Sequence, residues 1–335
     1  MSSNRPTASL LEAAPALIAN SDSLREAFGK ALAQLGDEMP NLVVLDADIA
    51  GGTGVHHFRT RHPARLVQFG IAEQNMMAAA GGMAAVDLIP VVTTFAVFCL
   101  RAIEQARLSL CYARRNAKIV ASHPGLDVGP DGGSAQALED MAAFRAIPGM
   151  VVISPADPIE MAQATRAILA YDGPVYMRTG RSPSPRLFGD DHKFEIGKGQ
   201  ILREGSDLTI IACGVEVARA LAAAETLKDD GIKARVVNMP TIKPIDTDLV
   251  ARCARETGVI VTAEDHNIHG GLGSAVAEAL AATVPCPIEF VGVKDVFGAS
   301  GEPEELAYYY EISAPFIVAA ARRALARKHN TKHAK

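Results

Sequence analysis

The sequence has 335 residues, enough for two ordinary domains with cores of their own. Its 33 Lys and Arg against 38 Asp and Glu leave a net charge of −5, which favours neither a nucleic-acid-binding nor a membrane-surface protein. No apolar run approaches the roughly 18 residues of a membrane span, and residues 1–23 lack the features of a signal peptide. The five cysteines are scattered through apolar segments, which is typical of reduced thiols, so we expect a cytoplasmic protein.

The predicted elements of the first half alternate between helix and strand. After a flexible segment at 1–20, Asp22 or Ser23 caps a helix that ends near Leu35, and a strand follows at 42–45. Further strands are predicted at 91–94, 117–121, 150–153 and 175–177, and helices at 97–114 and 158–170. This alternation is typical of a mostly parallel sheet with helices on both faces.

Two segments of this half are rich in glycine and polar residues. Asp46, Asp48 and residues 51–54 follow the strand at 42–45, at the place where open α/β sheets bind ligands. The segment has neither a complete dinucleotide-binding pattern nor a phosphate-binding loop, so a flexible connector fits it equally well. Residues 122–139 contain too much Gly, Pro and Asp for a regular element, and a long irregular loop in a compact domain is more often functional than accidental.

The segment 66–101 places one acidic residue in an apolar setting. A strand ends near Phe69, Gly70 makes a turn, and Glu73 falls in the first turn of a helix at 72–85 that is dense in Ala, Gly and Met. The helix dipole favours a carboxylate there. A surface carboxylate that caps its helix would explain Glu73 equally well. In a buried helix, however, the carboxyl group has to be protonated, paired or hydrogen-bonded to a ligand.

A break at 178–198, where Pro, Ser and charge are concentrated, separates the two halves. The second half alternates again, with strands at 208–213, 234–238, 258–263 and 288–291 and helices at 215–228, 246–255, 274–282 and 314–327. We therefore predict two doubly wound, mostly parallel-sheet α/β domains. They span 21–180 and 201–328, with a linker at 181–200 and a tail at 329–335.

Five motifs, in order and in spacing, resemble the transketolase family. We find the resemblance to its pyrimidine-binding domain in FGIAEQN, TTFAVF, ASHPGLDVGPDGGSAQALED and PADPIEM, and to its C-terminal domain in EDHNIHGGLGSAV. The motifs cover nearly the whole chain. They imply a thiamine-diphosphate-dependent transferase that moves a two-carbon ketol unit from a ketose to an aldose.

The resemblance assigns the pyrimidine end of the cofactor to this chain. In the family, the acid at the position of Glu73 hydrogen-bonds the N1′ nitrogen of the aminopyrimidine ring and so promotes loss of the C2 proton of the thiazolium, which makes Glu73 a catalytic candidate. Phe95 and Phe98 resemble the aromatic pair that packs on this ring, although a Phe pair alone is typical of any core. Arg101 falls where many transketolases have an aromatic residue and is expected at the pocket rim, and Asp48 is a further candidate for cofactor binding.

The resemblance also implies residues that bind substrate. His123 matches a family histidine near the donor sugar and is the second catalytic candidate, and Asp131 matches an aspartate that recognises a sugar hydroxyl. Arg25 and Arg178 match two arginines that grip a sugar phosphate, a role that suits the guanidinium group because its fork binds phosphate bidentately. The substrate is therefore expected to be phosphorylated or otherwise anionic, sulfonate included.

The loop departs from the family at one position. Typical transketolases have DG-x-T-H-Q, whose histidine contacts the donor, whereas this chain has Ala135 there. Losing that donor weakens recognition of one sugar hydroxyl by about 1–3 kcal/mol unless another group replaces it. Arg181 is a weaker candidate for the phosphate-binding role.

The sequence has no match to the family domain that holds the diphosphate through a GDG motif followed by an asparagine. The resemblance therefore implies a large partner subunit that carries this motif and holds Mg²⁺ or Ca²⁺, while this chain binds no metal. Because the family site spans a dimer interface, we expect two copies of each subunit, and activity only in that assembly.

Two other classes of function remain open. One is a different thiamine enzyme with the same two domains, either the beta subunit of a 2-oxo acid dehydrogenase decarboxylase component or a relative of deoxyxylulose-phosphate synthase. The DVGPDGG motif and the arginine pair favour a sugar phosphate over a 2-oxo acid. The second is a non-catalytic regulatory or interaction protein of the same fold, which Ala135 favours and Glu73 disfavours.

Overall fold

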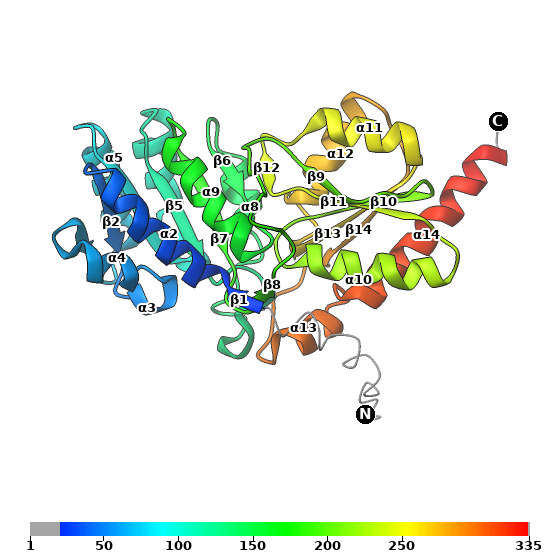
Figure 1. Cartoon of the computed structure of the whole chain (residues 1–335), viewed down its shortest axis with the longest axis horizontal. Coiled ribbons are helices and arrows are strands. Elements are labelled where there is room, and N and C mark those ends of the chain that lie inside the picture. The colour runs from blue at the N-terminus through cyan, green and yellow to red at the C-terminus, as the bar shows by residue number, and fades with distance from the viewer. Residues whose placement is uncertain (1–20, 334–335) are drawn as a thin grey trace.

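The computed structural model describes residues 21–333, which form two α/β domains side by side (Figure 1). The predicted flexible segment at 1–20 lies outside the described residues. Each domain has a central, mostly parallel sheet with helices on both faces, so the predicted fold class is confirmed. No helix within residues 21–333 combines the length and the apolar character needed to cross a membrane.

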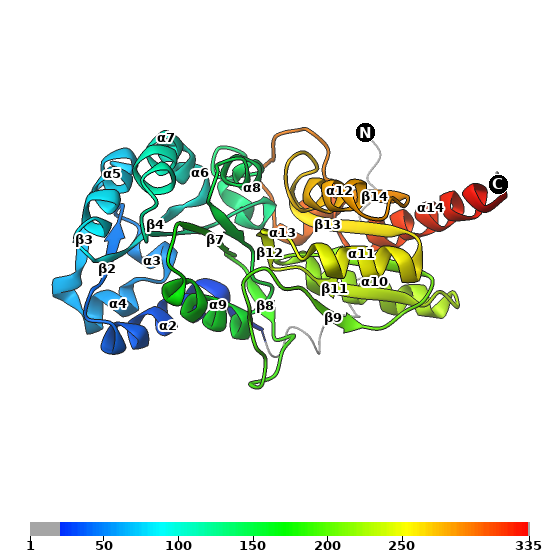
Figure 2. The same ribbon diagram turned by 90° about the horizontal axis from the view of Figure 1, so that it is seen from above.

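A seven-stranded sheet in the order β12-β6-β7-β5-β4-β2-β3 organises the first domain. All of its strands except β12 run parallel, namely β2 (Leu42–Asp46), β3 (Leu66–Gln68), β4 (Ile89–Phe95), β5 (Lys118–Ser122), β6 (Val151–Ile153) and β7 (Val175–Thr179). The main helices are α2 (Leu24–Glu38), α5 (Glu73–Ala84), α8 (Asp140–Arg145) and α9 (Pro158–Ala170). Figure 2 shows α5 and α8 on one face of the sheet and α2 and α9 on the other.

Two short pairings tie the first domain to the rest of the chain. The edge strand β12 (Thr241–Lys243) comes from the second half and pairs antiparallel with β6. The strand β1 (Ser21–Ser23) pairs antiparallel with β8 (Pro183–Pro185), and β8 lies inside the predicted linker. Neither β12 nor β8 was predicted, because three-residue strands show no periodicity and their partners lie far away in the sequence. The boundary between the domains is therefore held by strand pairs, and β12 of the second half completes the sheet of the first domain.

The second domain has a five-stranded sheet in the order β14-β13-β10-β11-β9, with only β9 antiparallel. Its strands are β9 (Gln200–Arg203), β10 (Leu208–Ala212), β11 (Ala234–Asn238), β13 (Ile260–Asn267) and β14 (Ile288–Val293). Its helices are α10 (Glu216–Asp229), α11 (Thr247–Thr257), α12 (Leu272–Ala282), α13 (Pro303–Tyr309) and α14 (Ala314–His333). In Figure 1, α11 and α12 lie on one side of the sheet and α10 and α14 on the other. The helix α14 extends beyond its predicted end at Arg327 into the predicted tail.

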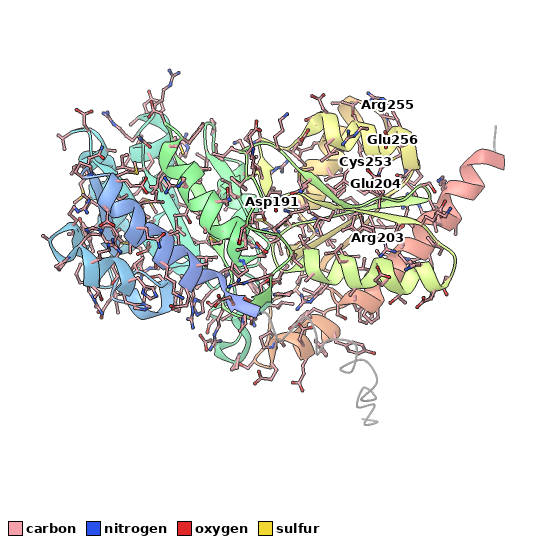
Figure 3. All side chains as sticks on the ribbon, in the orientation of Figure 1. Asp191, Arg203, Glu204, Cys253, Arg255 and Glu256 are labelled. Atoms are coloured by element: carbon pink, nitrogen blue, oxygen red, sulfur yellow. The ribbon has the colours of Figure 1, made fainter. Side chains whose placement is uncertain are left out.

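One buried arginine joins β11 to its neighbours in this domain. Arg235 pairs with Glu204 and Glu256, and its Nη1 lies 3.8 Å from the Sγ atom of Cys253. Figure 3 shows Glu204, Cys253 and Glu256 gathered at one place on the second domain. All five cysteines of the chain are unpaired, and all but Cys286 are buried.

The predicted continuous helix at 97–114 is broken. The segment consists of α6 (Ala96–Cys99), a 3-10 turn at Leu100–Ala102, α7 (Ile103–Gln105) and a π-helix at Ala106–Tyr112. Ala102 has φ −111° and ψ 20°, outside the helical region. The break lies at Arg101, one of the predicted site residues, and irregular helix geometry of this kind is frequent at functional sites.

Candidate active site

Glu73 lies in the first turn of α5, as predicted, and its carboxylate is buried. The side chain is 4% exposed, whereas that of its partner Arg101 is 60% exposed. Nη1 of Arg101 donates a hydrogen bond to Oε2 of Glu73 over 3.1 Å. The other carboxylate oxygen makes no hydrogen bond within residues 21–333. Arg101 thus pairs with one oxygen of the buried carboxylate, and the other oxygen can accept a hydrogen bond from a ligand.

Three aromatic rings line up where β4 and β5 end. Phe95 closes β4 and Phe98 belongs to α6, and their ring centroids lie 5.6 Å apart with planes 15° apart. The imidazole of His123, directly after β5, also stacks on Phe95, with ring centroids 3.9 Å apart. Because β4 and β5 are parallel neighbours, their carboxyl ends bring these residues together.

One glycine of the segment 51–54 contacts this stack. Gly52 lies in α3 (Ala50–Thr53), and a Cβ atom there would lie 2.7 Å from the ring of Phe95. Any side chain would displace the phenyl ring. The backbone of α3 therefore forms one wall of the aromatic pocket, and the glycine-rich pattern after the strand at 42–45 was the signal for it.

His123 is a neutral imidazole at pH 7. Burial, together with the positive charges of Arg25 and Arg181, lowers its pKa to about 4, against the opposing charge of Asp131. Its backbone N–H donates to the carbonyl of Thr179, which holds the residue in a left-handed conformation with φ +59°. Nδ1 lies 3.0 Å from the hydroxyl of Ser122, and Nε2 has no partner within the described part of the chain.

Arg25 and Arg181 face His123 from two different elements. Arg25 is the second residue of α2, and its buried Nε atom has no hydrogen-bond partner within residues 21–333. Arg181 donates from Nη1 to the carbonyl of Val128 and forms an ion pair of 3.4 Å with Asp131. The structure thus brings together two cations, one carboxylate and a neutral imidazole next to the aromatic stack.

Arg178, which was predicted to bind the sugar phosphate, pairs with groups inside the protein. Its guanidinium is buried and forms an ion pair with Asp140, and Nη1 donates to the carbonyl of Asp265 over 2.9 Å. Arg178 lines a cavity of about 20 Å³, which is too small for a phosphate. The sequence identifies the arginine but does not show which way its side chain points. In the structure the side chain links β7 to β13 of the second domain.

Asp48 lies on the loop after β2 without a hydrogen bond to its side chain within residues 21–333. Its φ is +65°, and its backbone N–H donates to Oε1 of Gln68 over 2.9 Å. Gln68 in turn donates from Nε2 to the buried carboxylate of Asp46, whose pKa is raised by burial. The structure leaves the exposed carboxylate of Asp48 outside the aromatic stack.

The second domain holds the loop at 122–139 in place. The carboxylate of Asp265 accepts hydrogen bonds from the backbone N–H groups of Leu126 and Asp127, over 2.8 and 3.1 Å. The carboxylate of Asp127 accepts from the backbone N–H of Arg181 over 2.7 Å. The sequence analysis missed both acids, although Asp265 lies within the EDHN motif. They fix Arg181 and the loop relative to each other.

One cavity of the described structure lies away from these residues. It has a volume of about 550 Å³ and is lined by the linker and by Glu160, His192 and Asn238. Figure 3 shows Asp191, one of its lining residues, between the two domains. No predicted site residue lines this cavity.

Comparisons with known proteins agree with this architecture. The family model described as "Transketolase, pyrimidine binding domain" matches residues 21–185, and "Transketolase, C-terminal domain" matches residues 197–317. The 6-deoxy-6-sulfo-D-fructose transketolase subunit SqwH of Clostridium sp. (strain MSTE9) is 41% identical, over 91% of this chain and 95% of that protein. A putative transketolase C-terminal section of Methanocaldococcus jannaschii is 44% identical, over 88% and 93%.

One solved structure resembles the whole described fold. It is titled "Split gene transketolase, inactive beta4 tetramer", is 46% identical, and superposes with a TM-score of 0.84 over 91% of this chain and 99% of its own. The predicted family resemblance is thereby confirmed. The chain belongs to the transketolase family and carries its pyrimidine-binding and C-terminal domains.

Proposed function

We propose that the chain is the small subunit of a thiamine-diphosphate-dependent transketolase, which transfers a two-carbon ketol unit between an anionic ketose and an aldose. The observation that carries this proposal is the buried carboxylate of Glu73 in the first turn of α5, with one oxygen free of partners within the described residues. A buried carboxylate is costly unless it serves a ligand or an ion pair, and Arg101 occupies only one of its oxygens.

The residues present fit the pyrimidine end of the cofactor. The free oxygen of Glu73 provides an acceptor for a protonated ring nitrogen, and Phe95 and Phe98 provide flat apolar surfaces for an aromatic ring. Bound thiamine diphosphate would supply the nucleophilic carbon that adds to the ketose. Glu73 holds the proton shared with the ring nitrogen, and Arg101 orients the carboxylate from the pocket rim. Asp48 remains a candidate for contact with the cofactor once the partner closes the site.

The charged cluster around His123 fits an anionic sugar. Arg25 has a buried Nε donor without a partner within residues 21–333, and Arg181 presents a second guanidinium next to it. A phosphate or sulfonate satisfies both cations, while Asp131 and Nε2 of His123 are placed to bond sugar hydroxyls. Ala135 replaces the histidine of typical transketolases. This substitution and the name of the SqwH relative both support a donor that differs from the usual sugar phosphates.

A large partner subunit is needed to hold the diphosphate with Mg²⁺ or Ca²⁺. The 335 residues contain no GDG motif, and the relatives are described as a subunit and as a C-terminal section. Ile71 and Val86, which flank the two ends of α5, and Tyr112 of the π-helix are exposed apolar side chains. Exposed apolar side chains of this kind are typical of an interface. We expect two copies of each subunit around shared sites.

The test is a ketol-transfer assay of the chain copurified with a large subunit that carries the GDG motif. We expect activity in the wild type and a loss of about 100-fold or more in Glu73→Gln, which keeps the size of the side chain but cannot share the proton in the same way. Glu104→Gln, which makes the same change at an exposed glutamate of α7, is the matched control. Full activity of Glu73→Gln contradicts the proposal, and decarboxylation of a 2-oxo acid without ketol transfer supports the dehydrogenase class instead.

A further inference from the structure

A second group of potential ligands lies beside the candidate active site and has no part in the proposed function. Glu26 follows Arg25 in the first turn of α2, and His56 and His57 open α4 (His56–Arg61). One donor atom from each of the three side chains lies within 4.8 Å of the other two. Nε2 of His57 is 2.6 Å from Oε2 of Glu26. All three side chains are half-buried, so an ion can reach them.

The backbone holds the two ligand-bearing segments together. A Cβ atom on Gly29 of α2 would lie 2.0 Å from the carbonyl oxygen of Gly54, and one on Gly54 would lie 2.1 Å from the carbonyl oxygen of Arg25. Gly54 also has φ +80°, a conformation that favours glycine. The turn before α4 therefore touches α2 directly, and the three donors are brought together by the fold itself.

The state of the donors is suited to a cation. Nδ1 of His56 is buried and has no hydrogen-bond partner within residues 21–333. A carboxylate and two adjacent imidazoles thus converge, while one buried ring nitrogen lacks any partner among the described residues.

We propose that Glu26, His56 and His57 bind a divalent transition-metal ion of the zinc class, with water at the fourth position. Two imidazoles and one carboxylate form a donor set that suits Zn²⁺, whereas Mg²⁺ and Ca²⁺ prefer oxygen ligands alone. The site is therefore distinct from the metal that the large subunit holds with the diphosphate. The ion joins α2 to α4 and fixes the start of α2, where Arg25 faces the substrate cluster.

The test is a zinc titration by calorimetry on the full chain after treatment with a chelator and without the large subunit, so its outcome does not depend on transferase activity. The sequence also has His329 and His333 four residues apart, a spacing that can bind metal. The parent protein for the titration therefore carries His329→Asn and His333→Asn. We expect one equivalent of zinc to bind.

The variants of the cluster should weaken binding. The double variant His56→Asn/His57→Asn and the single variant Glu26→Gln should each reduce zinc affinity at least tenfold, while His269→Asn, which removes an exposed histidine elsewhere, should leave it unchanged. Cobalt should give a tetrahedral visible spectrum only where the cluster is intact. Thermal unfolding with chelator present checks that each variant is folded. Zinc should raise the melting temperature of the parent and of His269→Asn, but not that of the cluster variants.

Two results overturn the proposal. One is the absence of stoichiometric zinc binding in the parent, and the other is binding that persists in the double histidine variant. Should that variant fail to fold, Glu26→Gln provides the same comparison, because it replaces one ligand at a half-buried position without a change of shape.

Discussion

Arg101 donates from Nη1 to Oε2 of Glu73 over 3.1 Å, so an exposed cation contacts a buried carboxylate. The contact depends on the broken helix at 96–112, because Arg101 lies in the 3-10 turn between α6 and α7. It leaves the second oxygen of Glu73 without a partner in the described structure. Arg101 therefore defines which oxygen a ligand can use.

Replacing Arg101 should weaken cofactor binding to a limited extent. We expect Arg101→Leu to reduce the affinity for thiamine diphosphate about two- to fivefold in the assembled enzyme, since an exposed ion pair contributes about 0.2–1 kcal/mol. Arg101→Gln keeps one hydrogen-bond donor, so its affinity for thiamine diphosphate should lie between those of Arg101→Leu and the wild type. Cofactor titrations followed by circular dichroism measure this. Tighter binding in Arg101→Leu would show instead that Arg101 competes with the cofactor for Glu73.

Arg25 and Arg181 should discriminate charged from neutral donors. Removing either guanidinium from an anionic group costs about 1.5–3 kcal/mol, so we expect Arg25→Ala and Arg181→Ala to raise KM about 10- to 100-fold for a phosphorylated or sulfonated ketose. The KM for a neutral ketose should change little. Steady-state kinetics with matched charged and neutral donors check this. Equal effects on both donors would argue that the arginines only support the loop.

Arg178→Met should act on stability and not on substrate recognition. Truncation leaves the buried carboxylate of Asp140 uncompensated, which costs about 3–5 kcal/mol. Urea unfolding measures the loss, and Arg178→Met/Asp140→Leu should recover part of it because the buried charge is then gone. A selective rise in KM for anionic donors, at unchanged stability, would show instead that Arg178 binds the substrate.

The elements predicted best from the sequence are those with local signals. The helix α9 was predicted at its observed bounds because Pro158 opens it and Asp157 caps it, its carboxylate accepting from the backbone N–H of Glu160 over 2.7 Å. The apolar run of β11 gave its bounds in the same way. The short strand β12 could not be predicted, because its only signal is its pairing with a distant edge of the first sheet.

The site shows the same limit. The position of Glu73 at the start of α5 follows from the helix pattern. The residues expected near it, such as Phe95 and Arg101, follow from the family resemblance. The direction of Arg178 does not, because it depends on Asp140 and on the carbonyl of Asp265, which lie 38 and 87 residues away. Sequence types and order identify the residues of such a site, whereas long-range packing decides which of them face the ligand.

His123 should make stability depend on pH. Burial lowers its pKa in the folded state from 6.5 to about 4, so between these values the unfolded chain binds more protons. Its contribution is full above pH 6.5 and is lost as the pH falls toward 4. About 2 kcal/mol should be lost between pH 7 and 5. Burial also lowers the pKa of His266 to about 4, whereas it raises the pKa of Glu216 and of Glu264 to about 7, which acts in the opposite direction. The contribution of His123 is therefore the difference in pH dependence between the wild type and His123→Asn. Urea unfolding at both pH values checks this, and an unchanged slope contradicts it.

The exposed apolar side chains that flank α5 should mediate assembly with the large subunit. Ile71 is 76% exposed and Val86 is 67% exposed, one at each end of α5, so a partner that covers this helix must desolvate both. We expect Ile71→Asp and Val86→Asp each to weaken association at least about tenfold, about 1.4 kcal/mol. Tyr309→Asp introduces the same charge at an equally exposed position in α13 and should have no comparable effect. Calorimetric titration of the small chain with the large subunit measures the affinities. Undiminished association of both α5 variants would place the interface on another face, and the shared site would then have to be sought there.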